Sequence, residues 1–157
     1  MQGSFYCNYF VTFQSQFYIM KRLLIISSFL FIAQIAVYSQ SKPYYAVFDL
    51  TTSDTATHSR VIRWLNGIIE AYPDAKLEVV FYGKALPMIE TGKSTVSNDI
   101  IKLAAGKNVV FVVCEQAMQV FKVDKTMLLP GVKTVPDGIY ELITKQADGY
   151  GYIKVTN

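Results

Sequence analysis

Cys114 is the residue of this chain whose type and position point most directly to chemistry. It ends the apolar run 109–113 and is followed by Glu115 and Gln116. A cysteine at the first turn of a helix lies at the positive end of the helix dipole, which favours the thiolate and therefore nucleophilic attack. A free cysteine more often fills a buried position as a small hydrophobic side chain. The sequence leaves both roles open.

The other candidate residues offer less specific chemistry. His58 is the only histidine, and it fits the rim of a helix as readily as a catalytic position beside Cys114. One histidine and one cysteine do not make a metal site. No glycine-rich phosphate-binding motif follows any predicted strand. The sequence therefore predicts neither a metal nor a cofactor.

Five β-strands alternating with helices are predicted to position Cys114. The strands are expected at 44–50, 75–82, 109–115, 132–135 and 150–155, and the helices between Asp54 and Tyr72 and at 85–89, 96–105, 116–123 and 139–147. The run 109–113 is apolar on both faces, as in a buried strand of a parallel sheet. The alternation predicts right-handed βα units. We expect an α/β, three-layer, flavodoxin-like fold with a five-stranded, mainly parallel sheet in the order 2-1-3-4-5, its last strand at an edge.

Three of the predicted helices have an apolar face that should pack on this sheet. In 96–105 the face is formed by Ile100, Ile101, Leu103 and Ala104. In the first helix the face is formed by residues at spacings of three and four, namely Val61, Trp64, Leu65, Ile68 and Ile69. In 116–123, Met118 and Phe121 are expected to face inward, with Val120 as a further candidate.

The expected strand order makes the first and third strands neighbours whose exit loops diverge. Ligands of open α/β sheets bind in the crevice at such a point. The residues expected to line it beside Cys114 are Asp49, Thr51, Thr52, Gly83, Glu115 and Gln116. Asp49 either contacts a ligand or caps the following helix, and the many capping groups from Thr51 to Asp54 favour capping.

The first 39 residues predict an export signal rather than part of the fold. Met20, Lys21 and Arg22 form a basic start, residues 23–33 an apolar core, and residues 37–39 a cleavage region. We expect a signal peptide at 20–39, with an uncleaved anchor as the alternative, and we interpret 1–19 as a wrongly assigned leader. Residues 40–157 then form a single domain, near the common domain size. The second cysteine, Cys7, lies in the leader.

The charge balance argues against a polyanionic partner. Removing Lys21 and Arg22 from the 15 basic residues leaves 13 against 12 acidic ones. Such a balance gives no electrostatic reason to bind nucleic acid. The expected protein is periplasmic or secreted and binds neither nucleic acid nor, after signal cleavage, a membrane.

An ordered set of segments resembles the DsrE/DsrF-like family over essentially the whole mature chain, with the exported single-domain members as the closest match. The segments are 47–52, 77–83, 109–115, 129–132, 135–138 and 149–154. Exported members commonly have Val-x-His-Gly where this chain has Val80-Phe81-Tyr82-Gly83.

The resemblance implies a flavodoxin-like fold and trimeric or hexameric oligomers. It further implies that Cys114 matches the cysteine that, in sulfur-relay members, accepts persulfide sulfur and passes it on. The leading hypothesis is an exported persulfide carrier acting through Cys114 with a sulfur donor or acceptor protein as partner. The alternative is a non-catalytic ligand-binding or assembly module in which Cys114 is structural. If there is an activity, it is at most sulfur transfer.

Overall fold

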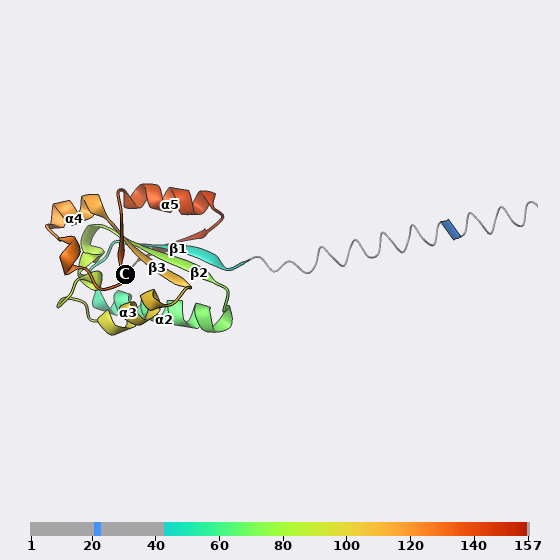
Figure 1. Ribbon diagram of the computed structural model, residues 1–157, viewed down its shortest axis with the longest axis horizontal. Coiled ribbons are helices and arrows are strands. Elements are labelled where there is room, and N and C mark those ends of the chain that lie inside the picture. The colour runs from blue at the N-terminus through green and yellow to red at the C-terminus, as the bar shows by residue number, and fades with distance from the viewer. Residues whose placement is uncertain (1–20, 23–42, 157) are drawn as a thin grey trace, which may run out of the picture. The chain divides into compact units, whose positions relative to one another are not determined.

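The computed structural model describes residues 21–22 and 43–156 (Figure 1). One five-stranded sheet is formed by β1 (Tyr45–Leu50), β2 (Lys76–Phe81), β3 (Val109–Cys114), β4 (Lys133–Val135) and β5 (Gly151–Val155). Every adjacent pair of strands is parallel. The predicted α/β class is confirmed. The predicted leader and signal peptide lie outside the described residues, apart from Lys21 and Arg22, and no described helix is long and apolar enough to span a bilayer.

The strands are arranged in the order β4-β3-β2-β1-β5. As expected, β1 is second from one edge and β5 is an edge strand. The neighbours of β1 differ from the expected order, because β5 lies beside it at the edge and β2 separates it from β3. The last strand returns across the sheet to pair with β1, with Asp49 opposite Lys154. The two exit loops expected to form the crevice are therefore one strand further apart than predicted.

Four helices and two 3-10 turns connect the strands. They are α2 (Thr55–Ala71), η1 (Gly83–Ile89), α3 (Ser97–Ala105), α4 (Glu115–Phe121), η2 (Lys125–Met127) and α5 (Gly138–Ala147). Helices α2 and α3 cover one face of the sheet and α5 covers the other (Figure 1). Side-chain caps fix two of the helix starts: Asp54 accepts hydrogen bonds from the Ala56 and Thr57 N–H groups, and Asp137 caps α5 in the same way. The sequence did not predict η2.

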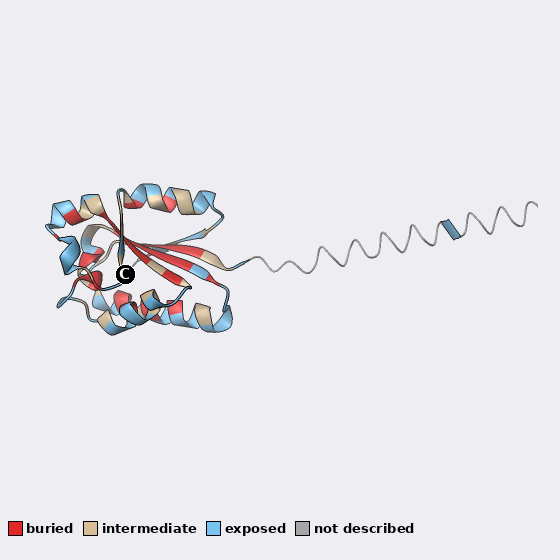
Figure 2. Ribbon diagram, in the orientation of Figure 1, coloured by how far each residue is buried: buried red, intermediate tan, exposed pale blue. Residues whose placement is uncertain are grey.

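The core is divided by the sheet into two unequal clusters. The larger cluster, on the α2 side, contains the fully buried rings of Phe48, Phe81 and Phe111. Buried positions are concentrated in the strands and on the inward sides of the helices (Figure 2). The smaller cluster, on the α5 side, consists of Val47, Val80, Val112 and Leu142 with partly buried neighbours. Successive strand residues therefore point to opposite clusters.

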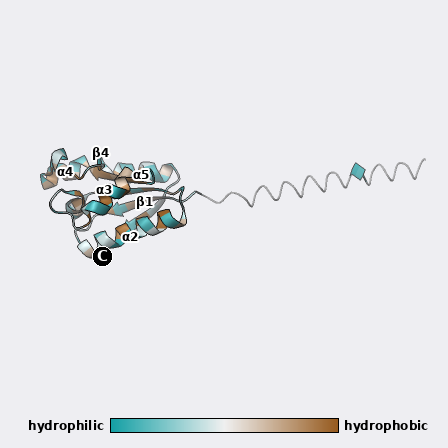
Figure 3. Ribbon diagram, turned by 60° about the horizontal axis from the view of Figure 1, so that its bottom comes forward, coloured by the Kyte–Doolittle hydropathy of each residue, from teal (hydrophilic) through white to brown (hydrophobic). Residues whose placement is uncertain are grey.

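Two aromatic side chains expected in the core are largely exposed. On α2, Val61 and Leu65 are buried, but Trp64 is 41% exposed beside the Arg60 guanidinium. Apolar and polar positions alternate along this helix in Figure 3. Phe121 is 47% exposed because α4 is only seven residues long and ends at a left-handed residue, so that Met118 is its buried side chain.

Candidate functional site

Cys114 is the last residue of β3 and the N-cap of α4. Its side chain is on the α5 side of the sheet, as is that of Val112. The residue is 7% exposed. A Cβ atom added to Gly138, the first residue of α5, would lie only 3.0 Å from the Cβ of Cys114. A side chain where α5 begins would therefore crowd the cysteine and require it to shift by a few tenths of an ångström.

Tyr82 borders Cys114 on the neighbouring strand. Phe81 pairs with Val113. The residues that follow them, Tyr82 and Cys114, therefore lie side by side at the carboxyl end of the sheet. The tyrosine ring also lies beside Gly138. Burial, followed by the interaction with the Asp49 carboxylate, raises the pKa of Tyr82 well above its ordinary value. The phenol therefore stays protonated at neutral pH.

Asp49 is a buried carboxylate at the carboxyl end of β1, on the same side of the sheet. It accepts a hydrogen bond from the Tyr152 hydroxyl, and its two oxygens lie 3.0 and 3.1 Å from the Lys154 Nζ atom. The hydrogen bond to Asp49 raises the pKa of Tyr152 to about 12. Asp49 does not cap α2, since Asp54 does so. The prediction that Asp49 caps the following helix is wrong.

These side chains form a polar row across four strands, from Cys114 on β3 through Tyr82 beyond β2 and Asp49 on β1 to Lys154 on β5. The Lys154 Nζ atom lies 5.7 Å from the centroid of the Tyr82 ring. This cation–π contact joins Lys154 to Tyr82 within the row. The row replaces the predicted crevice between the first and third strands. These are the polar side chains closest to the thiol along this edge of the sheet.

The predicted residues of the two loops next to Asp49 shape the backbone there. Gly83 has a φ of +60°, and a Cβ on it would lie 3.6 Å from the Thr51 carbonyl oxygen. That oxygen accepts the Lys84 N–H at 3.0 Å. The Thr51 hydroxyl lies 3.4 Å from Lys154 Nζ. Thr51 and Gly83 are thus brought together at the edge of the row.

Thr52 and His58 make hydrogen bonds that hold the loop after β1. The Thr52 hydroxyl accepts the Asp54 N–H at 3.2 Å, and the Thr52 carbonyl oxygen lies 2.8 Å from the His58 Nε2 atom. The histidine is buried, and this bond ties the start of α2 to the loop that follows β1. We therefore assign His58 to the packing of this loop and not to a catalytic pair with Cys114.

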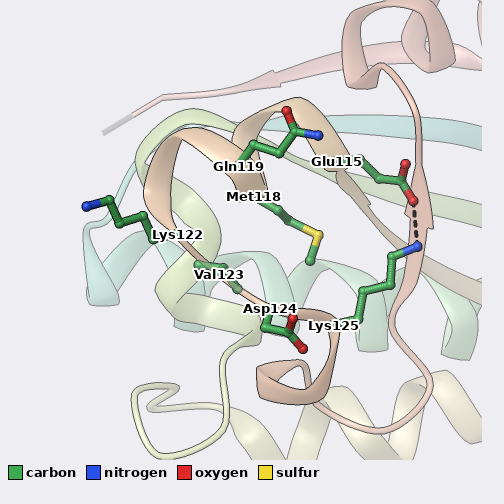
Figure 4. Close-up of a pocket in the computed structure, with 7 residues that line it drawn as sticks. All are labelled: Glu115, Met118, Gln119, Lys122, Val123, Asp124 and Lys125. Atoms are coloured by element: carbon green, nitrogen blue, oxygen red, sulfur yellow. Dashed lines mark hydrogen bonds and ion pairs between the residues drawn. The ribbon is translucent and has the colours of Figure 1, made fainter.

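Glu115 is turned toward η2 and β4. One carboxylate oxygen, Oε1, lies 2.7 Å from Lys125 Nζ and accepts a hydrogen bond from the Thr134 hydroxyl at 2.8 Å. These bonds, that to Lys125 first, lower the pKa of Glu115. Figure 4 shows the carboxylate facing Lys125 at the rim of a hollow of about 410 Å³ between α4 and the segment that leads into η2. Gln116 is exposed.

Sequence reasoning missed Tyr82, Tyr152, Lys154 and Gly138. Alternation within each strand would have put Tyr82 on the same side as Val80, and Lys154 on the same side as Tyr152. What the sequence did not supply was which strands are neighbours. Within residues 21–22 and 43–156, no three His, Cys, Asp or Glu side chains are close enough together to hold a metal ion.

Comparison with known proteins identifies the family. A model of the DsrE/DsrF-like family matches residues 44–155. The chain belongs to this family. No curated protein gives a significant match. The resemblance seen in the ordered segments is confirmed, and in this DsrE-like chain the match runs from the start of β1 to the end of β5.

Two solved structures share the DsrE-like fold of this chain. One is the protein of unknown function MTH1491 from Methanobacterium thermoautotrophicum, with 24% identity and a TM-score of 0.66 over 71% of this chain and 98% of its own. The other is the ychN protein from E. coli, with 11% identity and a TM-score of 0.60 over 72% of this chain and 99% of its own. Both are similar along nearly their entire length. At these identities the similarity establishes the fold alone.

Proposed function

We propose that this DsrE-like protein is an exported persulfide carrier in which Cys114 is the sulfur-accepting nucleophile. The observation that carries the proposal is the position of Cys114 at the carboxyl end of β3, where it adjoins the polar row. Among the described residues it is the free cysteine. Membership of the DsrE/DsrF-like family supports sulfur relay as the general function.

The proposed reaction is an exchange between sulfur atoms with no net redox change. The Cys114 thiolate attacks the outer sulfur of a donor persulfide, R–S–SH. A new S–S bond forms to Cys114 as the donor S–S bond breaks, and the donor leaves as the thiolate R–S⁻. An acceptor thiolate then attacks the outer sulfur of the Cys114 persulfide. The acceptor leaves as a persulfide and the Cys114 thiolate is regenerated.

The neighbouring groups would assist this exchange in different ways. Backbone N–H groups of Glu115 and Gln116 at the start of α4 would stabilise the anionic sulfur. Tyr82 borders Cys114 as a neutral phenol, and burial followed by the Asp49 carboxylate raises its pKa further. The Glu115 carboxylate is held by Lys125 and Thr134, which limits its repulsion of the thiolate.

One observation favours the alternative of a non-catalytic binding or assembly module. At 7% exposure and in contact with the first residue of α5, Cys114 offers little surface to a donor. A persulfide carrier must expose the sulfur of Cys114 further to admit a donor. A structural cysteine need not do so.

Sulfur loading tests the proposal directly. The full-length protein is exposed briefly to polysulfide and its intact mass is measured, with and without prior iodoacetamide. We expect a gain of one or more sulfur atoms that reductant reverses and alkylation blocks. Because the full-length chain also contains Cys7, the comparison is made in a Cys7→Ser background. In that background the chain with Cys114 should load, whereas the chain that also carries Cys114→Ser should not. Loading of Cys114→Ser equal to that of the wild type would contradict the assignment.

The rate of alkylation separates the two candidate functions. A sulfur carrier should react at Cys114 with iodoacetamide under native conditions at a rate within about tenfold of the rate in denaturant, since its thiolate must reach a donor. The alkylation rate is measured as a function of urea concentration. If Cys114 reacts only when the whole protein unfolds, the binding module remains as the function. Gly138→Ala, which crowds Cys114, should slow the native reaction further.

We also propose that the protein forms a homo-oligomer, a trimer or hexamer, and meets a donor or acceptor protein in the periplasm or outside the cell. Exposed Ile139, Tyr140 and Ile143 on α5 support an assembly surface close to Cys114. Sedimentation should give a mass above that of one chain, and Ile143→Asp should lower it. A monomeric wild-type protein would contradict this part of the proposal.

A further inference from the structure

A second concave site lies on the opposite side of the sheet from Cys114. It is a groove of about 510 Å³ between α2 and the β1–β5 edge. Its lining consists of Tyr44, Phe48, Arg63, Trp64, Gly67, Ile68, Ala71, Tyr72 and Ile153. The strand residues Phe48 and Ile153 point to the α2 side, whereas Asp49 and Lys154 point to the α5 side. The groove is therefore separated from the polar row by the thickness of the sheet.

The groove is open because helix α2 carries a glycine where a side chain would fit. A Cβ added to Gly67 would meet no atom within 4 Å, so packing within the described residues does not require a glycine. Glycine in a helix interior costs roughly 1 kcal/mol relative to alanine. The chain thus carries a locally unfavourable residue among the α2 residues that line the groove.

The aromatic walls of the groove are exposed yet held in place. Trp64, 41% exposed, lies beside the Arg60 guanidinium, which is 5.5 Å from its ring centroid. Tyr72, 52% exposed, stacks on Tyr44 with 4.8 Å between ring centroids. Rigid aromatic surfaces facing a cavity of a few hundred cubic ångströms are typical of small-molecule sites.

Arg63 supplies the groove's charge. It is the charged side chain among the described residues that line the groove, and no carboxylate lies with it there. An arginine at the rim of an apolar cavity suits a planar anion, because its guanidinium donates two parallel hydrogen bonds to a carboxylate or sulfonate. The lining is thus complementary to a molecule with an apolar body and a single negative charge.

We propose that this groove binds a small anionic molecule with an aromatic or otherwise apolar body. The body lies against Trp64, Tyr72 and Ile68, above Gly67, and the anionic group pairs with Arg63. This site is independent of sulfur transfer at Cys114. Its ligand would occupy the protein whether or not Cys114 carries sulfur.

A pair of fluorescent probes tests the proposal in the full-length protein. Anilinonaphthalene sulfonate has the expected aromatic body and anion, and phenylnaphthylamine has the same body without the charge. Trp64 is the only tryptophan in the sequence, so energy transfer from tryptophan to the probe reports binding close to it. We expect saturable transfer with one probe bound per chain.

Two substitutions with matched controls locate the probe. Gly67→Leu should abolish transfer to both probes, whereas Asn66→Leu, an exposed neighbour outside the groove, should leave it unchanged. Arg63→Gln should weaken the sulfonate about tenfold, as the loss of a charged hydrogen bond predicts, and leave the uncharged probe unchanged. Lys102→Gln on α3 is the control for net charge. Circular dichroism checks folding, and Gly67→Ala, which should weaken binding partially, is the second variant if Gly67→Leu does not fold.

Several outcomes would overturn the inference. Probe fluorescence without loss of tryptophan emission would place the probe elsewhere, as would unchanged transfer in Gly67→Leu. Equal weakening of both probes by Arg63→Gln would show that Arg63 does not recognise charge. A second copy of the chain, and not a small ligand, covers the groove if two results are found together. The fraction of chains that bind the probe decreases as the protein concentration is raised, and Gly67→Leu lowers the sedimenting mass.

Discussion

The two faces of the sheet differ in what they bury. The α2 face buries rings and aliphatic side chains, with Phe48, Phe81 and Phe111 at its centre. The α5 face has a smaller apolar cluster and carries the buried carboxylates of Asp49 and Glu78 together with Cys114. A buried charge destabilises a protein unless it is compensated, and both carboxylates of this face have a lysine partner, Lys154 for Asp49 and Lys145 for Glu78. The α2 face thus holds the larger apolar core, and the α5 face holds the thiol and the polar row.

The connection pattern explains this division. Helix α2, η1 and α3 all pack on one face, which leaves α5 to cover the other. A single helix encloses less apolar volume, and the carboxyl ends of β1, β2 and β3 remain near solvent beside its first turn. Side chains such as Tyr82 and Lys154 can there be partly hydrated.

The largest expected difference between the faces is in unfolding free energy. Phe111 and Val112 are adjacent on β3, are both buried and face opposite clusters. Phe111→Ala should cost about 3 to 5 kcal/mol because it empties the centre of the larger core. Val112→Ala should cost about 1 to 2 kcal/mol. Urea unfolding measures both, and a loss below about 2 kcal/mol for Phe111→Ala would contradict its place at the centre of the larger core.

The buried glutamate of the α5 face should make stability depend on pH. Burial raises the pKa of Glu78 to about 7, against an ordinary 4.5, although Lys145 Nζ lies 2.9 Å from its carboxylate and opposes the shift. The folded protein then binds more protons than the unfolded chain between about pH 4.5 and 7. The free energy of unfolding should fall by about 1 to 3 kcal/mol as pH rises through this window.

Glu78→Gln is the matched test of that pH dependence. The amide keeps the shape of the side chain and cannot titrate, so its unfolding free energy should vary less across the window. Glu141 and Tyr150, which also lie near Lys145, remain unchanged in the variant. An identical slope in Glu78→Gln and the wild type would assign the pH dependence to other groups.

Removing the charge of Asp49 should change the titration of Tyr152, which donates a hydrogen bond to it. Asp49→Asn removes the negative charge that opposes tyrosinate, so the pKa of Tyr152 should fall from about 12 toward its ordinary value of 10.0. Ultraviolet absorbance during alkaline titration reports this change, and Tyr152→Phe identifies the transition. A Tyr152 transition that stays in place would show that Asp49 does not control it.

The smallest effect is expected for the exposed ion pair on α4. Lys125→Ala removes the partner of Glu115, whose carboxylate is also bound by Thr134. Exposed pairs contribute about 0 to 1 kcal/mol, so thermal unfolding should change little. Native alkylation of Cys114 should slow if the freed carboxylate turns toward the thiol. A large loss of stability would mean that the pair does more than hold Glu115 in place.

Local sequence signals determined the elements of this protein. Each predicted strand lies within two residues of its observed bounds because apolar runs and turn residues mark where strands begin and end. The position of Cys114 between β3 and α4 followed from the same signals. The exposure of Trp64 and Phe121 did not, because an apolar spacing does not tell how wide a face the sheet covers.

Only the tertiary structure decided which residues surround Cys114. The bond between Lys154 and Asp49 joins residues 105 positions apart, and it exists because β5 pairs with β1. Edge pairing of this kind depends on long-range packing and leaves no mark in local periodicity. It places β2 between β1 and β3, and so sets Tyr82 beside the cysteine. The sequence by itself determined the thiol and the strand that carries it, and the strand order determined the thiol's neighbours.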